Sequence, residues 1–73
     1  MTTIKCNNSE RKSVKFMNNG ETIIVFALQD GEYWFEIGDG YCTANGAKKA
    51  AVREMKKQGY TFDANEMKNL QIS

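Results

Sequence analysis

Apolar and β-branched residues gather in segments that short turn sequences separate. Asn18-Asn19-Gly20 lies between SVKFM and ETIIVFAL, and Asp30-Gly31 lies between IIVFALQ and EYWFEI. Asn-Gly and Asp-Gly favour hairpins because these residues tolerate positive φ. The flanking β-branched and aromatic residues favour strands. The pattern therefore predicts three antiparallel strands at about residues 13–18, 21–29 and 32–38.

The second hairpin suggests which face of this sheet is buried. Residues that lie directly opposite each other on paired strands share a face. A two-residue turn at Asp30-Gly31 pairs Leu28 with Tyr33, Phe26 with Phe35 and Ile24 with Ile37. We expect this strongly apolar face to form the core. The other face then carries Ile23, Val25, Ala27, Trp34 and Glu36.

The register of the first hairpin has two solutions. A two-residue turn at Asn19-Gly20 places Phe16 opposite Ile23, on the second face. A three-residue loop with Gly20 in the left-handed region shifts the register by one. We favour the longer loop, because it brings Val14 and Phe16 to the strongly apolar face and turns Lys15 and Met17 away from it.

Two helices are predicted after the strands. Thr43 is a suitable N-cap, residues 44–58 are mostly good helix formers, and Gly59 is a natural stop. Asp63 and Glu66 resemble a capping box, which predicts a short helix at about 64–70. Helical periodicity places small apolar residues on one arc of the first helix and basic residues on the opposite arc. The apolar arc consists of Ala47, Ala51 and Met55, with Ala50 and Val52 at its edges.

These elements predict one small α+β domain over residues 1–73. A three-stranded antiparallel sheet carries one amphipathic helix on one face, with a short C-terminal helix beside it. Residues 2–6 alternate enough to add a fourth strand. Four residues of the C-terminal segment are expected to complete the core: Tyr60, Phe62, Met67 and Leu70.

Composition narrows the chemistry available to this domain. The chain contains no histidine and only two cysteines, which removes the usual general base and a four-thiolate zinc site. Asp30, Glu32, Glu36 and Asp39 lie close along the chain, but their spacing does not match a calcium loop. The composition still allows a catalytic pair of Cys42 with a lysine, or of a serine with a lysine. No sequence pattern places a base beside Cys42, however. We therefore expect a protein that is not an enzyme and holds no metal or cofactor.

The sequence also indicates in which cellular compartment the protein is expected. The longest apolar run, Ile23 to Leu28, has six residues, too few to span a membrane. The first residues lack the apolar region of a signal peptide. We expect a cytoplasmic protein in which Cys6 and Cys42 are reduced. A disulfide between them would require the N-terminal segment to lie beside the end of the third strand.

The exposed side of the sheet leads to the favoured function. One helix cannot cover both faces of a sheet, so the face with Trp34 is expected to mark an interface unless a terminal segment folds over it. We predict a small protein–protein interaction module, a regulator or inhibitor that occludes a larger protein. Small anti-defence effectors encoded by phages have a similar size and match this description. A third hypothesis is that the chain forms a homodimer through the same face. The predicted contact residues are Trp34, Ile23, Val25, Met17, Glu32 and Glu36.

The alternative function is nucleic-acid binding by the basic side of the main helix. Gly38-Asp39-Gly40 followed by Ala47-Lys48-Lys49-Ala50-Ala51 superficially resembles the C-terminal half of a double-stranded-RNA-binding domain. That resemblance implies phosphate contacts from a lysine-rich helix N-terminus. The family's first helix has no counterpart here, and the lysines come later in the helix than the motif requires, so we assign no family. Duplex RNA or DNA would be held by Lys48, Lys49, Arg53, Lys56 and Lys57.

The net charge of +1 conceals three blocks of alternating sign. Residues 1–15 carry a net charge of +3, residues 16–47 carry −5 and residues 48–73 carry +3. Near-neutrality argues against indiscriminate binding to polyanions. The separation of charge instead suits a directed electrostatic contact with a partner.

Overall fold

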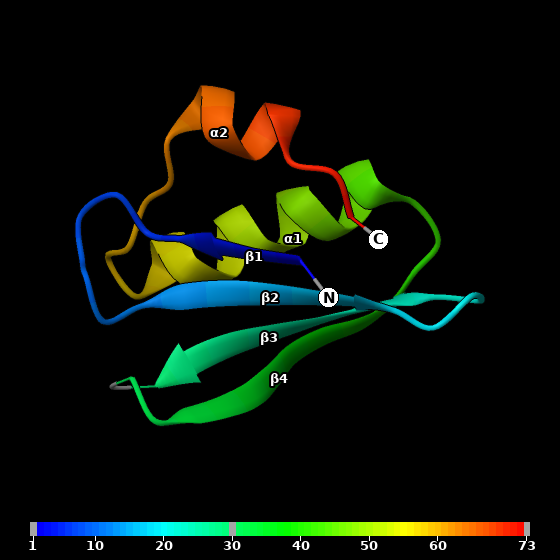
Figure 1. Ribbon diagram of the computed structural model, residues 1–73, viewed down its shortest axis with the longest axis horizontal. Helices are drawn as coiled ribbons and strands as arrows, with labels where there is room; N and C mark the ends of the chain where they lie inside the picture. The colour runs from blue at the N-terminus through cyan, green and yellow to red at the C-terminus, as the bar shows by residue number, and fades with distance from the viewer. Residues whose placement is uncertain (1, 30, 73) are drawn as a thin grey trace.

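Four antiparallel strands, paired in chain order, form one sheet with two helices on a single face (Figure 1). The computed structural model describes residues 2–29 and 31–72. The predicted α+β fold is confirmed, including the short N-terminal strand. No helix within the described ranges is long and apolar enough to cross a membrane. The elements are β1 (Thr2–Lys5), β2 (Ser13–Asn18), β3 (Ile23–Gln29), β4 (Tyr33–Tyr41), α1 (Ala44–Lys57) and α2 (Ala64–Asn69).

The helix ends follow the predicted signals. The Thr43 hydroxyl accepts a hydrogen bond from the backbone N–H of Gly46 at 3.0 Å, which caps α1. Helix α1 ends at Lys57, with Gln58 as its C-cap. Gly59 follows with a φ of 88°, in the left-handed region. Asp63 caps α2 by accepting from the N–H of Glu66 at 2.9 Å. Local sequence therefore specifies both helices.

The favoured register of the first hairpin is wrong. Phe16 pairs with Val25 and Asn18 with Ile23, so four residues separate the paired ends of β2 and β3. Side-chain oxygens support this longer loop, because Asn18 accepts from the N–H of Gly20 and Asn19 accepts from the N–H of Thr22. Val14 and Phe16 do lie in the core, as predicted, but they share that face with Ile23, Val25 and Ala27.

The second hairpin also differs from prediction by one residue. Gln29 pairs with Tyr33 and Leu28 with Trp34, which makes a three-residue loop in place of the expected two. Residue 30, the first of the predicted turn pair, lies outside the described residues. The shift moves Tyr33 and Phe35 away from the side of Leu28. Tyr33 is 69% exposed and Phe35 is 39% exposed. The prediction that both rings belong to the core is therefore wrong.

Strand β4 is longer than predicted and absorbs Gly38-Asp39-Gly40. The pairing changes register between Val25 and Ile23, where Val25 lies opposite Gly38 and Ile23 lies opposite Tyr41. Extra residues on one strand in this way are typical of a β-bulge. The predicted strand-to-helix connection at these glycines therefore shortens to the two residues between β4 and α1.

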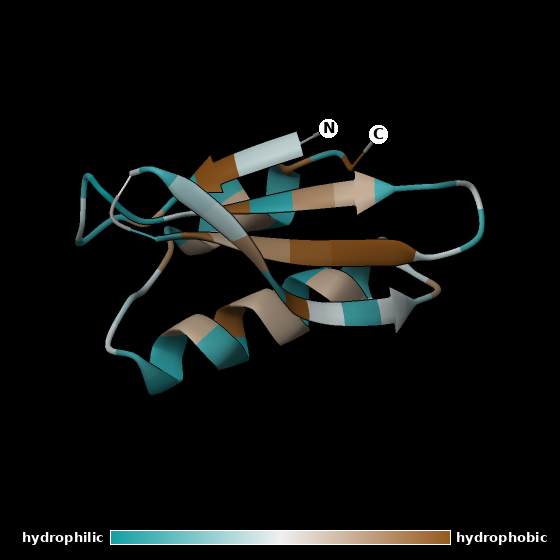
Figure 2. Cartoon of the chain, turned by 90° about the horizontal axis from the view of Figure 1, so that it is seen from below, coloured by the Kyte–Doolittle hydropathy of each residue, from teal (hydrophilic) through white to brown (hydrophobic). Residues whose placement is uncertain are grey.

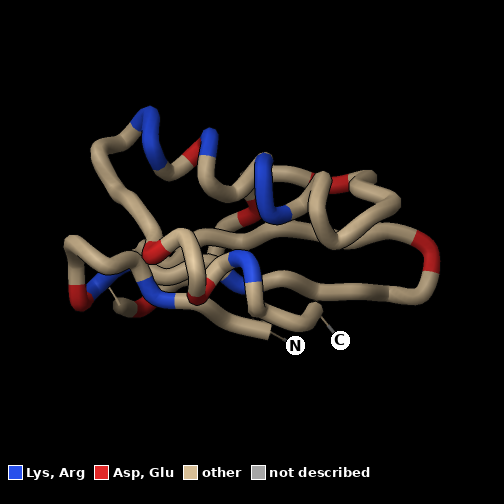
Figure 3. The backbone as a smooth tube through the Cα atoms, turned by 90° about the horizontal axis from the view of Figure 1, so that it is seen from above, with Lys and Arg blue, Asp and Glu red and all other residues tan. Residues whose placement is uncertain are grey.

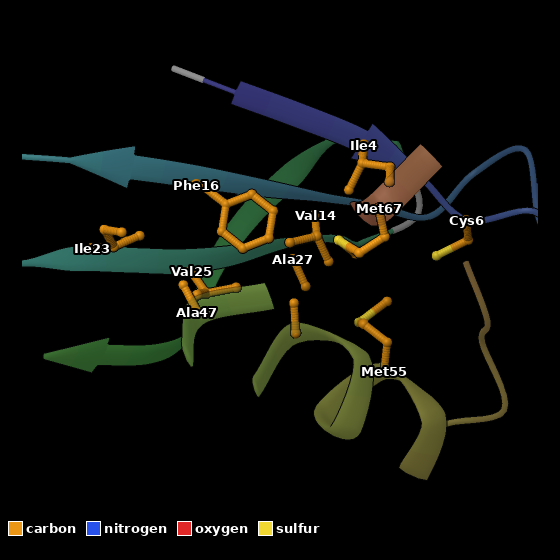
Figure 4. Close-up of a cluster of buried hydrophobic side chains, with 11 residues drawn as sticks. Ile4, Cys6, Val14, Phe16, Ile23, Val25, Ala27, Ala47, Met55 and Met67 are labelled. Atoms are coloured by element: carbon orange, nitrogen blue, oxygen red, sulfur yellow. The ribbon is translucent and has the colours of Figure 1, made fainter. Parts of the chain in front are cut away.

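The core lies between the sheet and the helical layer (Figures 2 and 4). Small residues of α1 approach the sheet closely, and Met67 of α2 completes the cluster beside Ile4. Phe16 and Val25 are fully buried at 0% exposure. Tyr60, Phe62 and Leu70 pack against this cluster in partly buried positions, as predicted. The buried residues of α1 are Ala47, Ala50, Ala51 and Met55.

Hydrogen bonds tie both terminal segments to the body of the domain. The N–H of Asn7 donates to the carbonyl of Thr61 at 2.9 Å, and the Asn8 amide donates to the carbonyl of Gly59 at the same distance. Thr2 donates through its hydroxyl to the carbonyl of Gln71 at 3.1 Å. These contacts hold the segment after β1 and the C-terminal segment on the helical side, away from the other face of the sheet.

Candidate functional site

The sheet face opposite the helices is the first candidate surface. We call it the open face. Strand pairing brings Lys15 opposite Phe26, Phe26 opposite Glu36 and Leu28 opposite Trp34, so these side chains share it. The core members on β3 occupy the alternate positions and point to the helices. On β2, β3 and β4 the open face consists of Lys15, Met17, Ile24, Phe26, Leu28, Trp34 and Glu36, and Thr3, Lys5 and Ser13 continue the same side toward the β1 edge.

A cation and two rings form the centre of the open face. The Lys15 ammonium lies 4.5 Å from the centroid of the Trp34 ring and 5.2 Å from that of Phe26. Such cation–π contacts fix the lysine stem and both rings relative to one another. Trp34 is 37% exposed, whereas Phe26 and the aliphatic residues around it are half-buried. The surface is therefore an ordered apolar strip, with the Lys15 ammonium held over its rings and Glu36 opposite Phe26.

Three of the six predicted contact residues lie on this face. Trp34, Met17 and Glu36 do so, and Glu32 is exposed in the β3–β4 loop. Ile23 and Val25 do not, because they are 5% and 0% exposed in the core beneath α1. Their placement on the binding surface is therefore wrong, for the reason that both hairpin loops are longer than expected.

The residues that replace them were missed by sequence reasoning. Ile24, Phe26 and Leu28 alternate with the buried β3 positions. The expected two-residue turn pairs them with apolar residues of the next strand, and this strongly apolar face is therefore predicted to form the core. The alanine-rich arc of α1 is the sequence feature that indicates the other face of β3 as the buried one. Alanines on α1 pack closely against β3 positions of modest volume such as Val25 and Ala27, and leave no room on that strand for side chains as large as Phe26 and Leu28.

A groove between α1 and α2 is the second candidate surface. It has a volume of about 620 Å³. The wall formed by α1 consists of Asn45, Lys48, Lys49, Val52, Arg53 and Lys56. The other wall consists of Phe62, Ala64, Met67 and Lys68. Basic positions accordingly gather on the helical layer (Figure 3).

The predicted nucleic-acid residues divide into groups with different local partners. Lys48 donates to the carbonyls of Lys68 and Leu70, and so holds the end of α2. Arg53 and Lys57 both contact the Glu54 carboxylate at 3.2 Å, which lowers the pKa of that carboxyl, chiefly through the hydrogen bond from Lys57. Lys57 does not line the groove, whereas Lys68, which the sequence reasoning omitted, does.

The cysteines lie at opposite corners of the sheet. Cys6 follows β1 and Cys42 follows β4, and these strands form the two edges. Both thiols are free, Cys6 buried and Cys42 exposed. Burial raises the pKa of the Cys6 thiol, and the nearby charge of Lys12 opposes that rise. A disulfide between them would require the N-terminal segment to lie beside the end of β4, and it lies at the opposite edge of the sheet.

The described residues contain no cluster of three or more His, Cys, Asp or Glu side chains that could hold a metal ion. No protein-family model, curated protein or solved structure was found to match this chain.

Proposed function

We propose that this chain is a non-catalytic protein-binding module that docks on a larger protein through the open face, as a small regulator or inhibitor. The observation that carries this proposal is the apolar strip of half-exposed side chains around Trp34, on the side of the sheet that neither helix covers. Tryptophan and methionine are favoured at protein interfaces, and aromatic anchors dominate their binding energy.

The order of this surface supports a docking role. The Lys15 contacts hold the Trp34 and Phe26 rings in place before any partner arrives. Preorganised anchors lose little conformational entropy on binding, which favours affinity. The exposed carboxylates of Glu32 and Glu36 lie at the same hairpin and add a polar rim that would select a partner with basic groups.

The test compares two neighbouring aromatic residues on β4. Trp34→Ala removes the anchor of the open face, while Tyr33→Ala removes an exposed ring on the opposite side of the strand. A partner isolated by affinity capture and then purified should bind the Tyr33→Ala protein normally. It should bind the Trp34→Ala protein at least about 30-fold more weakly, since hot-spot truncations cost about 2 kcal/mol or more.

The fold must be checked in the same experiment. Circular dichroism should show both variants folded, and loss of folding in Trp34→Ala would make Trp34 a structural residue and end the proposal. Because Trp34 is the single tryptophan of the chain, its fluorescence also reports directly on the open face. A concentration-dependent change in light scattering, abolished by Trp34→Ala, would replace the partner with a second copy of this chain.

Duplex nucleic-acid binding by the basic side of α1 stays a prediction. Two observations make it the weaker candidate: the Lys48 ammonium contacts the end of α2, and the Glu54 carboxylate lies between Arg53 and Lys57. Titration with duplex RNA and DNA at low salt tests it, because phosphate contacts would give a steep decline of affinity with added salt.

A further inference from the structure

The groove between α1 and α2 lies in the helical layer, on the side of the molecule away from the open face. Six of its lining positions are on α1, from Asn45 to Lys56, and successive positions are in turn three residues apart and adjacent. Such positions form one side of a helix. They lie beside the buried alanine side, so α1 uses one side for the core and another for the groove.

The floor of the groove is apolar. Val52 stands near the middle of α1 and is 39% exposed, although its neighbour Ala51 is fully buried. Phe62 and Met67 approach from the other wall, where both also pack into the core or against it. An exposed valine facing two large apolar side chains across an open groove is a surface that a further apolar group would cover favourably.

The rim of the groove is basic. Lys49, Arg53 and Lys56 lie along α1, and Lys68 stands on α2. None of the lining residues is acidic. Among the described residues, Arg53 of this rim pairs with Glu54, and no ion pair is formed by Lys49, Lys56 or Lys68. The groove therefore presents several cations with few carboxylates to balance them.

The groove is already formed in the structure. The Lys48 ammonium donates to the carbonyl of Lys68 at 3.2 Å and also to that of Leu70, which joins the C-terminal end of α2 to α1. At the other end of α2, Asp63 caps the helix, and buried Met67 anchors its middle. Because both walls are fixed, a ligand would not have to order them.

We propose that this groove binds an acidic amphipathic helical segment of a partner protein. A large apolar side chain of the segment would cover Val52, and its carboxylates would meet Lys49, Arg53, Lys56 and Lys68. Positions 45 to 56 span about 16 Å of helix, which matches about three turns of a docked helix. The charge of the groove argues for such a partner, and the site is independent of the open face.

Other occupants fit the groove less well. A duplex offers phosphates and sugars, and nothing to cover the apolar floor. A single aliphatic carboxylate would cover the floor but would satisfy only one or two of the cations. An acidic amphipathic helix supplies an apolar stripe flanked by several carboxylates, and so complements both features at once.

The probe is a fluorescein-labelled synthetic peptide of 14 residues, with leucines at helical spacing and glutamates elsewhere. Fluorescence anisotropy at low salt measures its binding to the full chain. A peptide of the same composition in scrambled order, which has no apolar stripe, is the matched ligand control. The proposal expects the amphipathic peptide to bind at least about tenfold more tightly than the scrambled one.

Charge reversal separates the groove from the rest of the surface. The double variant Lys49→Glu with Lys56→Glu should weaken peptide binding at least about tenfold, because it places like charges against the glutamates. Lys5→Glu with Arg11→Glu makes the same change in net charge away from the groove, and should weaken binding less than threefold. Val52→Ser, which removes apolar contact from an exposed position, should weaken it about threefold or more and leave the fold intact.

Several results would overturn this proposal. They are equal binding of the scrambled peptide, stronger competition by duplex RNA or by decanoate than by unlabelled peptide, and absence of binding at millimolar peptide. Self-association abolished by Lys49→Glu with Lys56→Glu would identify a second copy of this chain as the occupant instead. Trp34→Ala should leave peptide binding unchanged, so the outcome is distinguishable from that of the open face.

Discussion

The two faces of the sheet are built from alternate residues of the same strands, yet they meet different surroundings. On β3, Val25 is fully buried against the alanine side of α1, and the adjacent Phe26 is half-exposed beneath the Lys15 ammonium. Hydrophobicity alone would bury the phenylalanine first, since it removes more apolar area from water. The difference teaches that fit to the covering helix, rather than the size of each side chain, selects the buried face.

The largest expected difference between the faces is in stability. Phe16→Ala should lower the free energy of unfolding by about 3–5 kcal/mol, because it leaves a cavity at a fully buried position. Phe26→Ala should lower it by about 1 kcal/mol or less, because the ring is already partly in water. Urea denaturation followed by circular dichroism measures both. Equal losses for the two variants would mean that the open face is covered in solution.

The second difference is in thiol reactivity. Iodoacetamide at pH 8 should label exposed Cys42 at least about 100-fold faster than buried Cys6, because Cys6 reacts only when the structure opens. The raised pKa of Cys6 acts in the same direction by lowering its thiolate fraction. In urea the two rates should converge, and rapid labelling of Cys6 in the native protein would contradict its burial.

The Cys6 pKa also sets the sign of a pH effect. A raised pKa means that the folded state favours the protonated thiol, so this group stabilises the fold below the ordinary thiol pKa. That contribution is lost as the pH rises through the higher pKa of the folded state. A Cys6→Ala protein should accordingly show a smaller decline of stability at alkaline pH.

The smallest expected effect concerns the open face itself. Lys15→Ala should lower stability by about 0.5–1 kcal/mol, since it removes the cation from the Trp34 and Phe26 rings. Lys15→Arg, which keeps a cation over the rings, should preserve stability and the Trp34 emission. If Lys15→Ala left the emission of Trp34 unchanged as well, the lysine would not be held on the ring in solution.

Particular residues show why much of the fold followed from local sequence. Thr43 and Asp63 cap their helices through bonds to residues three positions later, and Gly59 adopts the positive φ that ends α1. These are short-range interactions, so the residues beside them suffice to predict the elements. The same holds for the three strands from β2 to β4 and for the amphipathic character of α1.

The residues that make up the two binding surfaces could not all be predicted from local sequence, because they depend on contacts between segments far apart in the chain. The open face changed because each hairpin loop was longer than its turn dipeptide indicated, and a register shift of one residue exchanges the two faces of a strand. Trp34, Met17 and Glu36 nevertheless lie where they were expected. Lys68 could not be joined to the lysines of α1 in advance, because only the packing of α2 beside α1 brings them to one groove.

The sequence by itself determined the α+β class, the order of the elements and the alternation of charge along the chain, since periodicity, caps and composition are local properties. The tertiary structure alone decided which side of β3 is buried and which cations gather around an apolar floor. Both decisions are made by contacts between segments far apart in the chain. There, the alanine surface of α1 and the Lys48 bonds to the end of α2 select one arrangement among several that the sequence pattern allows.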